Sequence, residues 1–405
     1  MSTFLLIIFT LFASNFIWWA WADAWLRKTH RAVGWRLAVG LYALSQAGLF
    51  VFMIYARMVD LGSAMPQPLL IAVYVWHLVI LPVVMLALIG RGLFKGVAGV
   101  VRAIAGKKTT AEPETLSSDP VLANGPTRRQ ILAATLVAAA PPVAELAAVT
   151  TAVTTLGSFR INKMDIAFRN LPSQLDGVTI AHLSDTHIGR FTHRGDIRQI
   201  AEATNRLDAD VVAFTGDLID FDLDELPNGL ELLKGLQPRH GVVVCEGNHD
   251  LFQDRSTFEQ GVMNAGFPLL LNESHTIDIN GYPMQFLGLQ WGEAALRRDP
   301  MLQQWAAVAL EKRRPDAFGV MLAHHPHAFD YAAKAGVQLT LAGHTHGGQL
   351  MLSKNVGPGP VMYRYWSGLY RQGNAACVVS NGIGNWFPLR INAPAEIVHI
   401  RLSKA

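Results

Sequence analysis

Two histidines, His344 and His346, stand one residue apart in the stretch LAGHTHGGQL, directly after an apolar run. In a β-strand, residues i and i+2 point to the same side, so two imidazoles at a strand end can converge on one object. A metal ion is the obvious candidate, because neutral imidazole is a common ligand. A lone His-x-His pair is weak evidence, since histidine has many other roles, and the rest of the chain has to decide.

Five apolar runs in the second half of the chain end in side chains that can bind a metal. The runs are GVTIAHLSD, ADVVAFTGD, GVVVCEGNHD, AFGVMLAHHP and VQLTLAGHTH. Their candidate ligands are Asp185, His187, Asp217, Asn248, His324, His344 and His346. Carboxylate, amide oxygen and imidazole together favour Mn, Fe or Zn. Capping of a strand end explains one such polar cluster. It does not explain five clusters at five strand ends, so the sequence predicts a metal site.

The order D-x-H, G-D, G-N-H-D, H and G-H-x-H resembles the calcineurin-like metallophosphoesterase superfamily, over about residues 160–402. The stretches GHTHGGQ and GIGNWFPLRINAPAEI resemble one branch most, the membrane-anchored or exported bacterial phosphoesterases. Some relatives in that branch hydrolyse the pyrophosphate of a lipid-A precursor, UDP-diacylglucosamine. The resemblance implies an α/β fold, a four-layer α/β/β/α sandwich with a two-metal site.

The resemblance also implies a role for each motif residue, and every motif position is filled. The implied ligands are Asp185, His187 and His346 for one ion, Asn248, His324 and His344 for the other, and Asp217 bridging both. His249, beside Asn248, would face the substrate, so His249 and Asp217 are the expected catalytic residues. We expect two divalent ions, with Mn favoured over Fe and Zn. Relatives often carry Asp after LG where this chain has LGLQWGE, which leaves Gln290 and Trp291 without a role.

Hydrolysis of a phosphoester explains why these residue types are needed. The reaction requires a nucleophile and relief of charge on the phosphoryl oxygens, and two metals ~3.5–4 Å apart can share a bridging hydroxide and clamp the phosphate. A bridging carboxylate suits Asp217, and a protonated His249 can donate to the leaving oxygen. The sequence therefore predicts a metal-dependent phosphodiesterase, phosphomonoesterase or pyrophosphatase.

The elements that position these residues are predicted from about residue 156 onward. The five apolar runs indicate strands buried on both faces, and RGDIRQIAEATNRL and LPNGLELLKGL have helical periodicity. We therefore expect residues 156–405 to form the α/β catalytic domain. Its two cysteines, Cys245 and Cys377, lie in apolar runs and are expected to be free and buried.

The first third of the chain has the composition of a membrane region. Hydrophobic residues make up 51% of the chain and charged residues 16%. Residues 4–26, 37–56 and 69–90 are each near the ~20 residues that span a bilayer as a helix, within a predicted membrane region 1–106. Arg and Lys concentrate in residues 27–36 and 91–129, which places these loops in the cytoplasm.

Two segments connect this region to the catalytic domain. Residues 107–127 are polar with several Pro and Ser, which predicts a flexible cytoplasmic linker. Residues 128–155 begin with an Arg pair, and they are either a fourth transmembrane helix or a twin-arginine-like signal anchor that uses the export machinery. Either alternative carries the catalytic domain outward, to the periplasmic face of a multi-pass protein of the bacterial inner membrane.

The predicted partners are the membrane and a phosphoester. A net charge of +3 is too small to indicate nucleic acid. Residues 349–373, QLMLSKNVGPGPVMYRYWSGLYRQG, mix aromatic, apolar and cationic side chains, which suits a phospholipid or a lipid-linked sugar phosphate. The alternatives are a general nucleotide or cyclic-nucleotide phosphodiesterase and a non-catalytic metal-binding sensor module.

Overall fold

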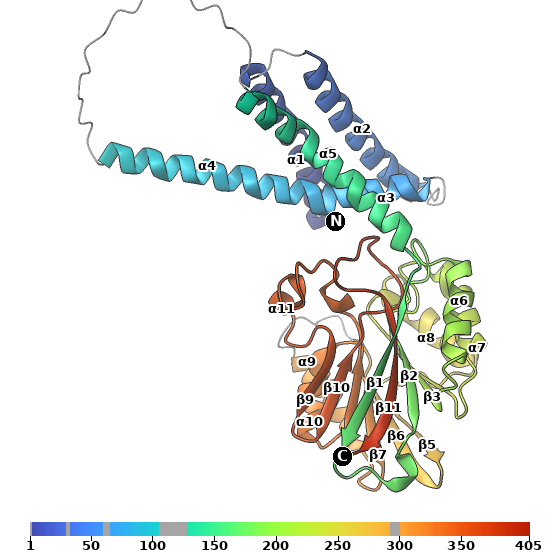
Figure 1. Ribbon diagram of the computed structural model, residues 1–405. Coiled ribbons are helices and arrows are strands. Elements are labelled where there is room, and N and C mark those ends of the chain that lie inside the picture. Colours follow the sequence, from blue (N-terminus) through green and yellow to red (C-terminus); the bar gives the residue numbers. More distant parts are fainter. Residues whose placement is uncertain (1, 30–32, 60–64, 105–127, 292–299) are drawn as a thin grey trace, which may run out of the picture. The chain divides into compact units, whose positions relative to one another are not determined.

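The computed structural model describes residues 2–29, 33–59, 65–104, 128–291 and 300–405 (Figure 1). The predicted linker 107–127 lies outside the described residues. The chain divides into two compact units, Met1–Thr154 and Thr155–Ala405, and each is described by itself.

The first unit is helical. Its helices are α1 (Ser2–Thr29), α2 (Val33–Met58), α3 (Gln67–Val75), α4 (Leu81–Ile104) and α5 (Arg128–Thr155), with a π-helical turn, Trp76–Ile80, between α3 and α4. By length and composition, three described stretches could cross a membrane: Leu5–Arg27, Val33–Ala56 and Gln67–Val101. The third is longer than the predicted 69–90, because the helix continues well past its apolar core.

Helix α5 presents one narrow stripe of small and polar side chains to the interior of this unit. Ala138, Glu145 and Ala152 are buried at intervals of seven residues. The carboxylate of Glu145 accepts hydrogen bonds from Tyr42 and Gln46 of α2. A buried carboxylate is costly in an apolar environment unless it is paired, so these two donors hold α5 in place.

The second unit contains two sheets. Their strands are β1 (Arg160–Phe168), β2 (Thr179–Leu183), β3 (Val211–Thr215), β4 (Val242–Cys245), β5 (Ser274–Ile279), β6 (Tyr282–Gly288), β7 (Phe318–Leu322), β8 (Leu339–Ala342), β9 (Gly368–Gln372), β10 (Ala375–Val379) and β11 (Glu396–Lys404). The first sheet has the order β1-β11-β2-β3-β4 and the second β5-β6-β7-β8-β10-β9. Strands β2, β3 and β4 are parallel, as are β6, β7 and β8.

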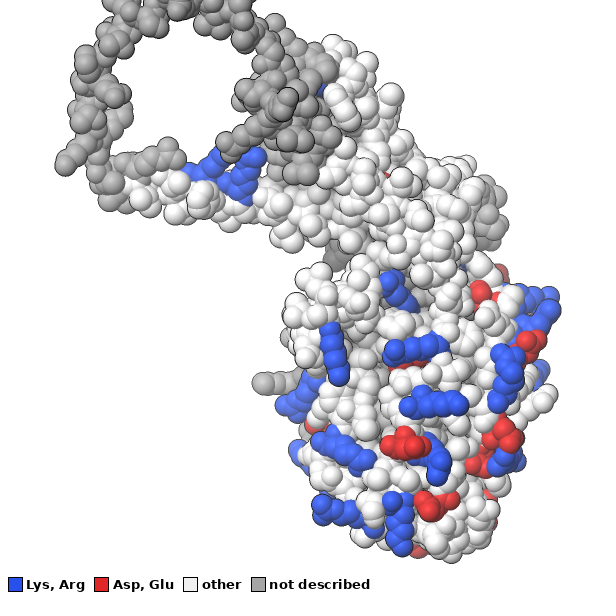
Figure 2. All heavy atoms as spheres, in the orientation of Figure 1, with Lys and Arg blue, Asp and Glu red and all other residues white. Residues whose placement is uncertain are grey.

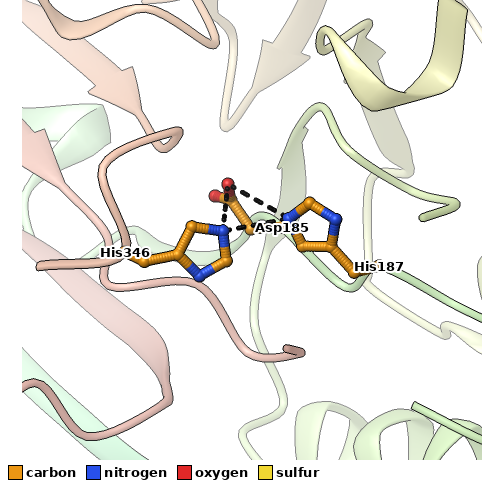
Figure 3. Close-up of side chains that lie close together, drawn as sticks. All are labelled: Asp185, His187 and His346. Atoms are coloured by element: carbon orange, nitrogen blue, oxygen red, sulfur yellow. Dashed lines mark hydrogen bonds and ion pairs between the residues drawn. The ribbon is translucent and has the colours of Figure 1, made fainter. Parts of the chain in front are cut away.

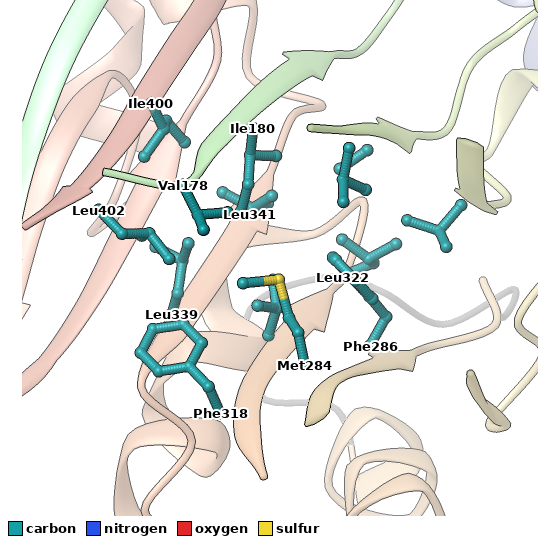
Figure 4. Close-up of a cluster of buried hydrophobic side chains, with 14 of the residues drawn as sticks. Val178, Ile180, Met284, Phe286, Phe318, Leu322, Leu339, Leu341, Ile400 and Leu402 are labelled. Carbon is teal, nitrogen blue, oxygen red and sulfur yellow. The ribbon is translucent and has the colours of Figure 1, made fainter. Parts of the chain in front are cut away.

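The two sheets pack face to face over one apolar core (Figure 4). Ile180, Val211 and Ile400 from the first sheet meet Phe286, Leu322 and Leu341 from the second. The outer faces are covered by α6 (Arg194–Asn205), α7 (Leu226–Gly235) and α8 (Arg255–Asn264) on one side, and by α9 (Pro300–Glu311) and α10 (Phe329–Lys334) on the other. This confirms the predicted α/β/β/α sandwich. Cys245 and Cys377 are free and buried, as the sequence favoured.

The hydrogen bonds of Glu145 predict that α5 is a retained helix of the first unit. Glu145→Ala should destabilise the detergent-solubilised chain by about 1–2 kcal/mol, the range for interhelical polar contacts in membranes, and lower its thermal midpoint. Leu146→Ala is the control, because Leu146 is 67% exposed. Equal midpoints for the two variants, or a purified chain whose intact mass lacks residues 1–155, would contradict this role.

Candidate metal centre

The predicted ligands lie where five strands end. Asp185 follows β2, Asp217 follows β3, Asn248 follows β4, His324 follows β7 and His344 follows β8. These strands run parallel within their sheets, so their carboxyl ends meet at one edge of the sandwich, where the loops of α/β folds place functional groups. The fold thereby brings residues that are far apart in sequence into one cluster.

The backbone at these positions is strained. Non-glycine residues with positive φ are uncommon, yet five candidate ligands have it: Asp185 (54°), His187 (44°), Asp217 (56°), His344 (71°) and His346 (48°). Such conformations persist only where the surrounding structure enforces them, and they concentrate at functional sites. Each turns a side chain back toward the cluster immediately after its strand.

Three of the ligands form a compact group (Figure 3). Nε2 of His346 lies 3.2 Å from Oδ1 of Asp185 and 2.9 Å from Nε2 of His187. Nε2 of His187 lies 3.9 Å from the same carboxylate oxygen. These are the three residues that the resemblance assigned to one ion, and all are buried.

His324 joins the cluster from the second sheet. Its Nε2 lies 3.1 Å from Oδ2 of Asp217 and 3.9 Å from Oδ1 of Asp185. Its Nδ1 lies 2.7 Å from the carbonyl oxygen of Thr215, so Nδ1 carries the proton and donates it. With Nδ1 anchored on this carbonyl, Nε2 is the ring nitrogen that faces the two carboxylates, which is the orientation that a metal ligand requires.

Asn248 and His344 complete the set of seven. Nδ1 of His344 lies 2.9 Å from Oδ1 of Asn248, and the amide of His344 donates to both oxygens of Asp185, at 3.0 and 3.1 Å. The His344 and His324 rings are 5.1 Å apart. Asp185 and Asp217 thus both lie between the two groups of histidines. The resemblance assigned the bridging position to Asp217 alone.

His249 lies on the half-exposed side of the cluster. Its amide donates to Oδ1 of Asp217 at 2.8 Å, and its Nδ1 lies 2.6 Å from the carbonyl oxygen of Asp220. His187, Asp217 and His249 also lie close enough together to hold a metal ion by distance alone. Because Nδ1 of His249 donates to Asp220, Nε2 is the ring nitrogen that remains for chemistry.

Asp220 was missed in the sequence, although TGDLID contains it. Its carboxylate Oδ1 lies 3.6 Å from Nδ1 of His187 and 3.5 Å from Nδ1 of His249. A carboxylate on the far nitrogen of a ligand imidazole fixes the ring and its tautomer. Asp220 therefore places a negative charge beside two functional histidines at once. Its place three residues after Asp217 was the available indication.

Two further charged groups support the ligands. The Asp250 carboxylate accepts from the amides of Asp217, Leu218, Ile219 and Gly247, so it holds the loops that carry the ligands. The guanidinium of Arg390 lies 2.9 Å from Nδ1 of His346 and donates to the carbonyls of Asn381, Gly384 and Ala393. The sequence gave no indication of this role for Arg390.

Trp291 covers the cluster from the stretch LGLQWGE, where the resemblance led us to expect Asp. Its ring lies 4.9 Å from the ring of His344 and 5.2 Å from that of His324. Its amide donates to Glu246 at 2.7 Å, and its carbonyl accepts from Arg255 at 2.6 Å. The departure therefore places an indole, and not a carboxylate, beside the candidate ligands.

The electrostatics of the cluster suit a cation. Burial opposes the charge of Asp217, but His324 and His249 outweigh it and hold the pKa of Asp217 well below its usual range. Burial lowers the pKa of His344 to about 3 and that of His346 to about 4. Near neutral pH Asp217 is therefore ionised and His344 and His346 are neutral, which are the protonation states that bind metal. Burial opposes the charge of the other two rings, but the neighbouring carboxylates outweigh it and raise the pKa of His187 to about 10 and that of His324 to about 9, so these two rings release a proton when a cation binds.

The second unit is similar to known metallophosphoesterases. The family described as calcineurin-like phosphoesterase matches residues 178–348. The uncharacterized metallophosphoesterase YkuE of Bacillus subtilis is 32% identical over 240 residues, which are 56% of this chain and 79% of that protein. A transmembrane protein with metallophosphoesterase domain from Danio rerio is 30% identical over 254 residues, 61% of this chain and 58% of that protein.

An uncharacterized metallophosphoesterase of Helicobacter pylori is 29% identical over 229 residues, 54% of this chain and 58% of that protein. The chain thus spans less than two thirds of the length of the Danio rerio and Helicobacter pylori proteins.

Proposed function

The chain belongs to the calcineurin-like metallophosphoesterases, and from this premise we propose that it is a metal-dependent phosphoric ester hydrolase with a dinuclear centre at the strand ends. The observation that carries the proposal is the convergence of the seven candidate donors at the strand ends, with Nε2 of His324 facing the buried carboxylates of Asp185 and Asp217. A sensor module has no need for such a set, so the enzyme is favoured over the non-catalytic alternative.

The donor set fits two divalent ions of the Mn, Fe or Zn type, since it combines carboxylate, amide and imidazole without thiolate. Asp185, His187 and His346 would hold one ion, and a second set would hold the other, with Asp217 shared. The second set consists of Asn248, His324 and His344. We favour Mn as the resident metal.

When bound, the two ions would neutralise charge on the phosphoryl oxygens and supply an activated water. The chain's own residues would do the rest. Asp217 fixes the amide of His249, and Asp220 fixes its Nδ1, so Nε2 of His249 is held ready to give a proton to the leaving oxygen. The side chain of His249 is 18% exposed, which leaves it accessible to substrate.

The roles assigned to His249 and Asp217 predict different metal contents when each residue is replaced by Ala. His249→Ala should retain close to two metal ions per chain and lose ~10²–10⁴-fold in turnover, the usual contribution of general acid catalysis. Asp217→Ala should lose metal as well as activity, because Asp217 lies between both groups of ligands. Elemental analysis and hydrolysis of a model phosphoester measure both quantities. Loss of metal in His249→Ala would make His249 a ligand and refute its assignment.

For the substrate we propose a phosphorylated lipid or a lipid-linked sugar phosphate. The support is an apolar rim of exposed side chains, which consists of Leu352, Val356, Val361, Met362, Trp386 and Ile391. The two loops that carry it are joined by the bridge between Leu350 and Ile391. The Trp386 ring is 6.3 Å from the ring of His346, so the rim adjoins the metal centre, as an acyl chain beside a bound phosphate requires.

This rim differs from the one expected in the sequence. The hydroxyl of Tyr365 donates to Asp330, and its ring packs on Phe329. Met351 is buried, and Trp366 packs against Gly359. These side chains therefore pack inward and support the loop from below, and they are not part of the exposed rim. The exposed contacts come from Leu352 and from α11 (Pro358–Met362).

The rim predicts a substrate-dependent defect. The double variant Leu352→Ser/Val361→Ser should hydrolyse a phospholipid in vesicles roughly tenfold or more slowly than the wild type, because apolar contact area is lost, yet hydrolyse a small soluble ester at an unchanged rate. Leu369→Ser on β9 is the matched control, since Leu369 is 42% exposed and lies outside the rim. Faster hydrolysis of nucleotides than of lipids by the wild type would favour the nucleotide phosphodiesterase instead.

We further propose a multi-pass protein of the bacterial inner membrane with the second unit in the periplasm. The support is the excess of Arg and Lys in residues 27–36 and 91–129 over 57–68, together with three helices long enough to span. A reporter fused after residue 405 should give a periplasmic reading. Replacing both Arg128 and Arg129 by Lys should leave that reading unchanged if α5 is a fourth helix, and abolish it if twin-arginine machinery exports the domain.

A further inference from the structure

The third candidate span is too long for a bilayer. Gln67–Val101 is 35 residues of continuous helix, which is about 52 Å at 1.5 Å per residue. The hydrocarbon core of a bilayer is only ~30 Å thick, and even a tilt of about 40° shortens the projection of this helix only to about 40 Å. A substantial part of α4 must therefore lie outside the hydrocarbon core.

Arg91 marks the level at which α4 leaves the core. Its guanidinium carbon lies 6.0 Å from the centre of the Trp21 ring on α1. Tryptophan and arginine are the side chains that anchor helices at the membrane–water interface, and Arg27 follows Trp21 on α1 after less than two turns. The membrane boundary therefore crosses α4 near Arg91.

Beyond Arg91, α4 does not become polar on all sides. Leu93, Val97, Val100 and Val101 follow the spacing i, i+4, i+7 and i+8, so they share one face, and their exposed fractions are 66%, 63%, 59% and 57%. They line a hollow of about 420 Å³ together with Gly92 and Gly96. Exposure of such a contiguous apolar face to water is unfavourable.

The opposite side of the same stretch is cationic. Arg91 and Lys95 are four residues apart, so they are neighbours along the helix. Figure 2 shows Lys and Arg side chains gathered along one side of α4, while the other side is uncharged. A helix with a basic side and an apolar side matches the composition of helices that lie in the plane of a membrane surface.

We propose that residues 91–101 of α4 form an interfacial helix that binds the anionic lipid surface of the same membrane. The apolar face lies among the acyl chains, which fill the hollow at Gly92 and Gly96, and Arg91 and Lys95 meet lipid phosphates. The bilayer is the partner of this apolar face, because the membrane-spanning part of the same helix holds residues 91–101 at the bilayer surface. Gly90 and Gly92 flank Arg91, and glycine weakens a helix locally, so this is the place where α4 can bend from the span into the membrane surface.

The test uses the full-length chain in nanodiscs, with nitroxide spin labels on single introduced cysteines. The native Cys245 and Cys377 are buried, so they are not expected to react with the spin label and are left in place. Labels at Val97→Cys and Val101→Cys should collide with oxygen and be shielded from a water-soluble nickel chelate. The label at Lys95→Cys should show the reverse pattern, because it lies on the basic side.

A second arm tests the charge of the lipid. The immersed fraction of the Val97→Cys label should rise as phosphatidylglycerol replaces phosphatidylcholine, and Arg91→Gln/Lys95→Gln should remove most of that rise, at about fivefold per cation. Nickel access to all three labels would mean that the helix projects into water, and would overturn the proposal. Shielding from both probes that depends on the number of chains per nanodisc would make a second copy the occupant, which also overturns it.

Discussion

The second unit is organised around two carboxylates, Asp185 and Asp217, that are buried in one cluster. Asp185 is 0% and Asp217 2% exposed, and like charges out of water repel each other and lose hydration. Two such buried carboxylates are stable only where neighbouring groups compensate their negative charge. His187, His324 and His346 lie within ion-pair distance of it, and divalent cations are the stronger compensation that the same donors fit.

Bringing these groups together places demands on the backbone. Side chains from five strand ends must point at one place, and left-handed backbone at the five ligands that follow β2, β3 and β8 turns those side chains toward it. The four amides that Asp250 accepts hold the loops after β3 and β4 in register. A Cβ on Gly343 would lie 2.2 Å from an oxygen of Asp185, so glycine there lets the loop after β8 approach the carboxylate. The strain is local, and the packed sheets beneath sustain it.

The two contacts with lipid that we propose, one in each unit, use the same combination of side chains. The apolar rim beside the metal centre contains exposed aliphatic groups with Lys354 in the same loop, and α4 carries an apolar face opposite Arg91 and Lys95. In each case apolar groups gain by leaving water while cations meet phosphate. In the proposed topology the two features lie at opposite faces of the bilayer, so α4 anchors the chain at the cytoplasmic surface and the rim serves the substrate at the periplasmic surface.

The sequence by itself determined an α/β domain and the seven candidate ligands, because the ligand types follow apolar strands in a fixed order and metals accept few donor types. The resemblance to a known family added the α/β/β/α layering. It could not show that Arg390 supports His346, 44 residues away, or that Glu145 pairs with Tyr42, 103 residues away. Nor could it show that Tyr365 packs inward while Leu352 faces solvent. Those relations depend on which distant segments the packing brings into contact, and periodicity reports only the local surroundings of a residue. Asp220 lies between these cases: its residue type was visible beside Asp217, but only the folded loop turned its carboxylate toward two histidines.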